Sequence, residues 1–189
     1  YANYKAYESM RQTVNMLAID PMFDMGDAES ILDSNTYLGK IILQQPNYLF
    51  NYSNIGYQTY FAEPKTLELI SKLYFDAYRL GETRSKIEDS EPIIRNADFI
   101  SFDISAIRFG DAPGCGNTSP NGFYGEEACQ LAKYAGMSDK LSSIGFYEFN
   151  PSLDKKGQTA HLLAQMLWCF IDGFNNRKND MPLTDTSGF

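Results

Sequence analysis

Hydrophobic residues occur along this chain in two patterns, short strand-length runs and longer stretches with helical spacing. The strand-like segments are expected at 14–19, 51–60, 77–80, 99–105 and 143–148. Helical segments are expected at 37–43, 64–75, 91–96, 124–135 and in a last helix whose apolar residues recur every three or four positions: Leu162, Leu163, Met166, Leu167, Phe170, Ile171 and Phe174. Strands that alternate with helices predict a parallel sheet covered on both faces, with the stripe of the last helix against it.

Two polar segments interrupt this pattern. Residues 26–36, rich in Asp and Ser, are expected to form a long loop before the helix at 37–43. Residues 106–122 contain several Pro and Gly residues, and a loop of this length inside a domain is usually functional or mobile. The segment Gly114-Cys115-Gly116 within it lacks the third glycine of a dinucleotide-binding motif, so a phosphate site is not expected there.

Acidic residues follow three of the expected strands. Asp20 and Asp24 come after the first, Asp103 lies at the end of the fourth, and Glu148 ends the fifth just before Asn150-Pro151. Because ligands of open α/β sheets bind beyond the carboxyl ends of strands, we expect these four acids to gather at one edge. Such a cluster needs a hard cation, raised carboxyl pKa values, or a basic side chain such as Arg108. The alternative is that the aspartates only cap turns and helix starts.

Composition excludes several classes of partner. Acidic residues outnumber basic ones by 24 to 16, which gives a net charge of −8 and disfavours nucleic acid and anionic membranes. No apolar run reaches the roughly 18 residues that a membrane span needs. The three cysteines, an odd number at wide spacing, fit a reducing cytoplasm better than a disulfide framework. The only histidine, His161, falls opposite the apolar stripe of the last helix and is expected at the surface.

The acidic motifs resemble those of the ureohydrolase family of arginase, agmatinase and formimidoylglutamase. The family pattern is Asp-x-His-x-Asp, then Ser-Phe-Asp-x-Asp, then Glu-x-Asn-Pro. This chain keeps the acids and the Asn-Pro pair but has Met22 in place of the histidine and Ser105 in place of the last aspartate. The resemblance runs from about residue 15 to 174. It implies an arginase-like three-layer αβα sandwich with a mainly parallel sheet, formed by residues 1–189 as one domain that lacks the family's N-terminal strands.

The resemblance also implies roles for individual residues. In the family, two manganese ions share a bridging water that attacks a guanidino or formimino carbon. Carried over by position, Asp20, Asp24 and Asp103 are metal ligands, and Glu148 binds the substrate. Met22 and Ser105 remove both unshared ligands of the second ion, because a thioether is too soft for manganese and a hydroxyl is a weak ligand. Leu38 stands where the family has a histidine thought to shuttle protons.

Two functions remain open at this point. The first is a non-catalytic family member that has lost its manganese pair, binds no metal or one weakly held divalent cation, and keeps a pocket for a small cationic or amidine ligand. The second is an active hydrolase of a linear amidine that works with one metal or with ligands from the missing N-terminal portion. In both cases the resemblance implies a homo-oligomer.

Overall fold

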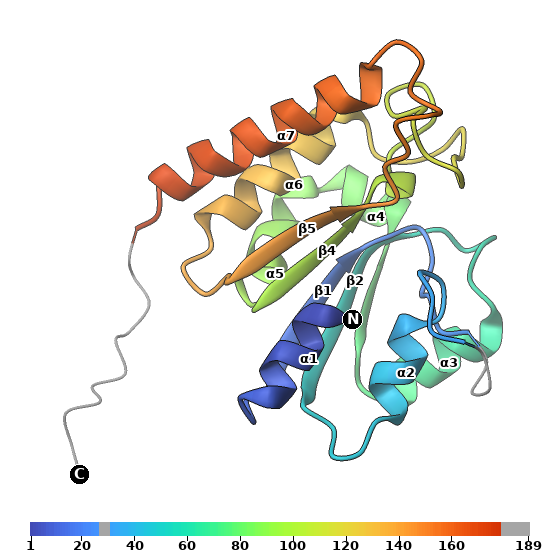
Figure 1. Cartoon of the computed structure of the whole chain (residues 1–189), viewed down its shortest axis with the longest axis vertical. Coiled ribbons are helices and arrows are strands. Elements are labelled where there is room, and N and C mark those ends of the chain that lie inside the picture. Colours follow the sequence, from blue (N-terminus) through green and yellow to red (C-terminus); the bar gives the residue numbers. More distant parts are fainter. Residues whose placement is uncertain (27–30, 179–189) are drawn as a thin grey trace.

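The computed structural model describes residues 1–26 and 31–178 (Figure 1). Five parallel strands form one sheet in the order β3-β2-β1-β4-β5. The strands are β1 (Val14–Ile19), β2 (Leu49–Tyr57), β3 (Asp76–Arg79), β4 (Phe99–Asp103) and β5 (Ser143–Tyr147). The predicted parallel sheet is therefore confirmed, although β2 begins and ends before the segment expected from its aromatic residues.

Helices follow the strands along the chain. They are α1 (Ala2–Ser9), α2 (Tyr37–Leu43), α3 (Pro64–Lys72), α4 (Leu80–Ser85), α5 (Ser90–Arg95), α6 (Gly125–Met137) and α7 (Gln158–Asn175). The sequence pattern predicts neither α1 nor α4, which are short and carry little apolar periodicity. The loop expected at 26–36 falls partly outside the described residues. Within the described part of the chain, no helix combines the length and apolar character that crossing a membrane requires.

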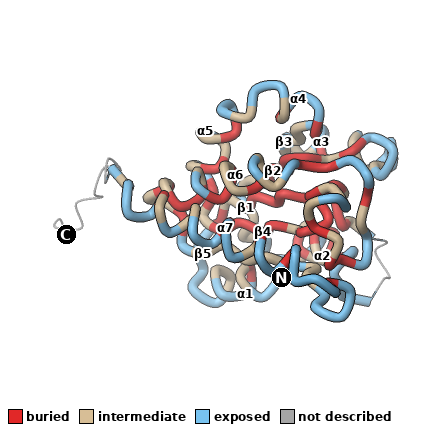
Figure 2. The backbone as a smooth tube through the Cα atoms, turned by 90° about the horizontal axis from the view of Figure 1, so that it is seen from above, coloured by how far each residue is buried: buried red, intermediate tan, exposed pale blue. Residues whose placement is uncertain are grey.

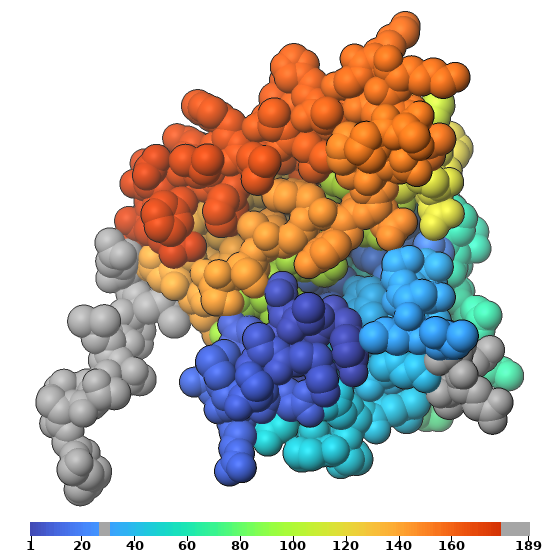
Figure 3. All heavy atoms as spheres, in the orientation of Figure 1, coloured from blue at the N-terminus to red at the C-terminus, as the bar shows by residue number. Residues whose placement is uncertain are grey.

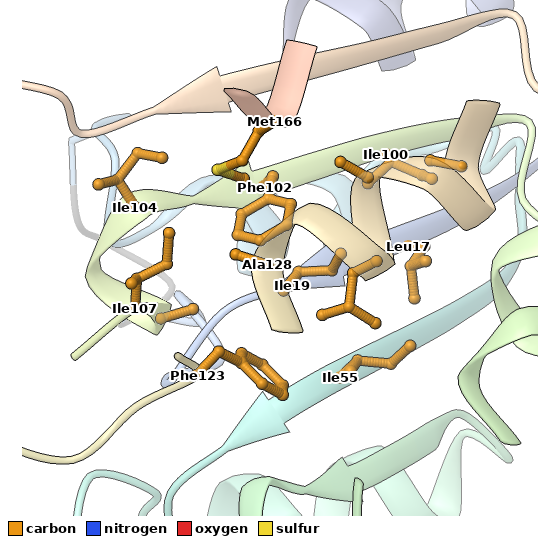
Figure 4. Packing of buried hydrophobic residues seen from close by; sticks show 14 of the residues in the cluster. Leu17, Ile19, Ile55, Ile100, Phe102, Ile104, Ile107, Phe123, Ala128 and Met166 are labelled. Carbon is orange, nitrogen blue, oxygen red and sulfur yellow. The ribbon is translucent and has the colours of Figure 1, made fainter. Parts of the chain in front are cut away.

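The sheet is covered on both faces. Successive residues of β1 point to opposite sides, so Leu17 and Ile19 belong to one buried cluster while Met16 and Ala18 belong to another. The first cluster includes residues of α4, α5, α6 and α7, and Figure 4 shows Met166 of α7 close to Phe102 of β4. The second includes residues of α1, α2 and α3. The buried strands lie between exposed outer segments (Figure 2), which confirms the three-layer sandwich.

The outermost helix, α7, departs from the prediction. Leu162 and Met166 are buried as expected, but Leu167, Ile171 and Phe174 are 46%, 55% and 51% exposed. Helix α7 lies along α6 at one outer edge of the molecule (Figures 1 and 3), so only part of its apolar stripe can reach the sheet. The expectation that the whole stripe packs against the sheet is wrong. The surface position of His161 on the same helix is confirmed.

The strand order creates a switch point beside β1. This strand pairs with β2 on one side and with β4 on the other, and Ile19 lies opposite Phe102. Asp20 and Asp103, the next residues along, therefore end neighbouring strands. Because the connections leave β1 and β4 in opposite directions, a crevice opens beyond their carboxyl ends, which is where open α/β sheets bind ligands.

Candidate functional site

A cavity of about 200 Å³ lies at this switch point. All four predicted acids line it, so the structure brings together Asp20, Asp24, Asp103 and Glu148. The wall is completed by side chains from α1, the strands and the segment before α2, among them Phe99, Ser101, Tyr37, Tyr147, Asp33 and Ser34. The site thus combines an acidic floor with several aromatic rings.

Asp20 and Asp24 form a pair in the turn that follows β1. Asp20 is 3% exposed and accepts a hydrogen bond of 2.7 Å from the backbone N–H of Met22. A side-chain hydrogen bond joins the Asp20 and Asp24 carboxyls, which requires one of the two to be protonated. Burial first, and then the charges of Asp24 and Asp103, raise the pKa of Asp20 well above its ordinary value. The pair therefore holds a proton more readily than two isolated aspartates would.

The neighbouring carboxyls are perturbed in the same direction. Burial, followed by the charges of Asp103 and Glu148, raises the pKa of Asp24 to about 7. The pKa of Asp103 rises to about 6, again chiefly through burial and with a contribution from Glu148. Asp103 also accepts a hydrogen bond of 2.6 Å from the backbone N–H of Ser105 and so caps the turn after β4. Asp20 and Asp103 therefore each cap a turn and are also repelled by neighbouring acids.

No basic side chain compensates these acids within the described residues. The suggestion that Arg108 folds back onto them is wrong, because its guanidinium pairs with Asp111 at 2.9 Å and lies over the Tyr124 ring. No Lys, Arg or His side chain of the described chain lines the cavity. Three features could offset the repulsion between these carboxylates: a hard cation, a basic side chain or raised carboxyl pKa values. Burial here gives the third, because it raises the pKa values of Asp20, Asp24 and Asp103.

Two of the acids have unusual backbone conformations. Asp24 has φ of 44° and Glu148 has φ of 65°, in the left-handed region that residues other than glycine seldom adopt. The backbone carbonyl of Asp24 accepts a hydrogen bond from the N–H of Leu38 at the start of α2, which helps to hold this conformation. Strained backbone of this kind persists where the surroundings fix it and is concentrated at functional sites.

Residues of the loop before α2 were missed by the sequence analysis. Leu38, aligned with the family's proton-shuttling histidine, is fully buried in the core, whereas Tyr37 beside it lines the cavity. Tyr37 makes a side-chain hydrogen bond with Ser101, and burial raises the pKa of its phenol well above the ordinary value. Asp33 adds a fifth acid to the cavity. Only the polar composition of the loop hinted at Asp33, and nothing in the sequence distinguished Tyr37 from its apolar neighbours.

Comparison with known proteins identifies the family. The pattern of the Arginase family matches residues 1–172. The chain belongs to the arginase family. Formimidoylglutamase of Staphylococcus aureus (strain MRSA252) is 30% identical over 182 residues, and that of Bacillus subtilis (strain 168) is 23% identical over 187 residues. These alignments cover 90% and 92% of this chain but 57% of each relative, so the chain spans a little more than half the length of the curated relatives it matches.

Solved structures share the arginase-family fold. A Trypanosoma cruzi formiminoglutamase with Mn²⁺ superposes with a TM-score of 0.81 at 18% identity, covering 93% of this chain and 61% of that one. Formimidoylglutamase from Bacillus subtilis gives a TM-score of 0.82 at 20% identity, with 94% and 58% covered. At these identities the likeness shows the fold alone.

The two substituted positions of the family pattern lie apart from the cavity. Met22 lines a different hollow, together with Phe23, Met25 and Phe61, on the other side of Asp24. Ser105 is 1% exposed, and its Oγ has no hydrogen-bond partner among the described residues. Ser105 stands where the family pattern has an aspartate, and its hydroxyl does not supply the negative charge of that carboxylate.

The donor set fits the paired manganese centre poorly. Three hard carboxylates remain, but a thioether and a hydroxyl stand at the two positions that the resemblance assigns to unshared ligands of the second ion. Within residues 1–26 and 31–178, no three His, Cys, Asp or Glu side chains stand in an arrangement that could hold a metal ion.

Proposed function

We propose that this protein is an arginase-family member whose paired manganese centre has been lost and which binds a small cationic ligand without hydrolysing it. The observation that carries the proposal is the cavity itself: Asp20, Asp24, Asp103 and Glu148 line it, while Met22 and Ser105 occupy the positions of two metal ligands and lie outside it. A bound cation would take over the role of the shared proton in offsetting their repulsion.

The shape and lining of the cavity support a small, positively charged ligand. Its volume of about 200 Å³ is below the 300 to 1,000 Å³ typical of sites for drug-sized molecules. The rings of Tyr37, Tyr147 and Phe99 lie beside the acids, and aromatic faces attract organic cations. A divalent cation held by water and one or two carboxylates, or an amidinium group, matches this chemistry.

The test measures metal content and turnover on the same preparation. The protein is dialysed against excess manganese, freed of unbound ion, and assayed by mass spectrometry for metal and by colorimetry for ammonia, formamide or urea release from amidine substrates. We expect at most one weakly held ion per chain and no release. Two tightly held ions with turnover would overturn the proposal.

A second function has its own observation in favour. Asp24 and Glu148 keep strained backbone conformations at the cavity, a feature that is found at active sites and ligand clamps. An active hydrolase of a linear amidine, working with one metal, would retain such strain. Turnover that requires manganese, saturates at one ion per chain and disappears in Glu148→Gln would establish this alternative in place of the first.

We also propose a cytoplasmic location and self-association. The three cysteines are free in the structure, and free thiols suit a reducing compartment. Trp168 is 67% exposed on the outward face of α7 beside the exposed part of the apolar stripe, and a contiguous apolar face of this kind often marks a protein interface.

A further inference from the structure

Helices α6 and α7 approach each other unusually closely. A side chain added at Gly136 of α6 would overlap the backbone carbonyl of Phe170, and one added at Gly173 of α7 would overlap that of Lys133. The helices therefore touch backbone to backbone, which only glycine permits. Figure 1 shows them lying side by side along their length.

Polar contacts fix the register of this helix pair. Lys133 pairs with Asp172 at 2.8 Å, and the Arg177 side chain donates a hydrogen bond of 2.8 Å to the Gly136 carbonyl. Both helices run in the same direction, because residue numbers increase together along the interface. One turn before the Lys133–Asp172 pair, this register places Cys129 of α6 opposite Cys169 of α7.

The two thiols meet across the interface. Cys129 and Cys169 lie close enough to influence each other's ionisation, both are free, and both are half-buried. Cys129 also lines an open groove between the helices, together with Glu126, His161 and Gln165. A small reagent can therefore reach the pair. The third cysteine, Cys115, is 3% exposed and lies in the loop after β4, away from this groove.

We propose that Cys129 and Cys169 are an oxidisable pair that forms a reversible disulfide between α6 and α7. The oxidant is a low-molecular-weight disulfide of the glutathione class. One cysteine thiolate attacks a sulfur of this disulfide, forming a mixed disulfide and releasing one thiol. The second cysteine, after losing its proton, attacks the protein sulfur of the mixed disulfide and releases the second thiol. Two protein thiols are oxidised and one disulfide is reduced to two thiols, so atoms and electrons balance.

The environment of the pair slows its oxidation near neutral pH. Burial, with a contribution from the neighbouring Cys169, raises the pKa of Cys129 to about 11. Because the thiolate is the attacking species, a raised pKa slows the exchange. The reaction is therefore examined at mildly alkaline pH, where more of each thiol is ionised.

The experiment treats the full chain with oxidised glutathione and maps its peptides without reduction. We expect one crosslinked species joining the peptides of Cys129 and Cys169, reversed by dithiothreitol. Free thiols should fall from the three of the structure to the single Cys115. The oxidised protein should also melt at a higher temperature than the reduced one, because the crosslink restricts the unfolded chain.

Matched variants decide between this pair and general thiol reactivity. Cys129→Ser and Cys169→Ser should each abolish the crosslink and the rise in melting temperature, whereas Cys115→Ser should retain both. Mixed glutathione adducts on separate cysteines, or crosslinks only between chains, would overturn the proposal. Peptide mapping of the wild-type protein gives this answer even if a variant folds poorly.

Discussion

At the scale of single residues, the site is governed by one conflict. The carboxyls of Asp20, Asp24 and Asp103 lie at the ends of β1 and β4. They are buried beside one another, and burial raises the pKa of each. A shared proton relieves this between Asp20 and Asp24. Since protons and metal ions compete for the same oxygens, any cation that binds here must displace that proton, and its affinity should increase as pH rises through 6 to 7.

Raised carboxyl pKa values predict how stability depends on pH. The folded chain holds more protons than the unfolded chain from about pH 4, near the unfolded aspartate value, up to the pKa of about 7 at Asp24, so stability falls as pH rises through this range. We expect the metal-free protein to melt at a higher temperature at pH 5 than at pH 8. Asp24→Asn should raise the melting temperature at pH 8 by several degrees, since each pKa unit corresponds to about 1.4 kcal/mol.

Calorimetry at both pH values checks this prediction, with Asp89→Asn, an exposed acid outside the cavity, as the control. An equal effect of Asp24→Asn at pH 5 and pH 8 would contradict it.

Restoring the family ligands should change metal binding. Met22→His with Ser105→Asp supplies an imidazole and a second carboxylate at the positions the family uses, so we expect manganese content to rise toward two ions per chain. Met22→His alone should do little, because Ser105 still leaves the second ion without its carboxylate. Metal analysis after dialysis measures both. If the double variant binds no more manganese than the wild type, then Met22 and Ser105 are not what limits manganese binding.

At the scale of elements, strand positions could be predicted and helix packing could not. The run of β1, apolar apart from Asn15, needs burial on both faces, and a central parallel strand is the structure that provides it. The strand-end position of Asp20, Asp103 and Glu148 followed from the same pattern, so their meeting was predictable. The exposure of the outward face of α7 was not predictable, because periodicity reveals an apolar stripe but does not reveal which element packs against it. Tyr37 and Asp33 reach the cavity because of the path of a long loop, and no local sequence pattern predicts that path.

The contact between α6 and α7 gives a prediction for this scale. Gly136→Ala should destabilise the protein by about 1 to 3 kcal/mol or more, because the added methyl group overlaps a carbonyl of α7 and the helices must separate. Gly81→Ala in α4 meets no atom within 4 Å and should be neutral or slightly stabilising. Urea unfolding of the two variants compares them. Equal stabilities would mean that the helices can separate at little cost.

At the scale of the whole molecule, the exposed part of α7 predicts association. Leu167, Trp168, Ile171 and Phe174 share one side of the helix, at successive spacings of one, three and three residues. We expect Trp168→Glu to lower the average mass measured by light scattering at high concentration. Tyr74→Glu, which changes an isolated aromatic residue that is 91% exposed, should leave it unchanged. A monomeric wild-type protein at every concentration would contradict this prediction.

The proton held between Asp20 and Asp24 also affects how the molecule moves in an electric field. The formal charge of −8 assumes that every carboxyl is ionised. Near pH 5, folding keeps Asp20, Asp24 and Asp103 largely neutral, so the native protein carries up to three fewer negative charges than the same chain in urea. Isoelectric focusing should therefore place the native band at higher pH than the unfolded band, and Asp24→Asn should narrow the gap.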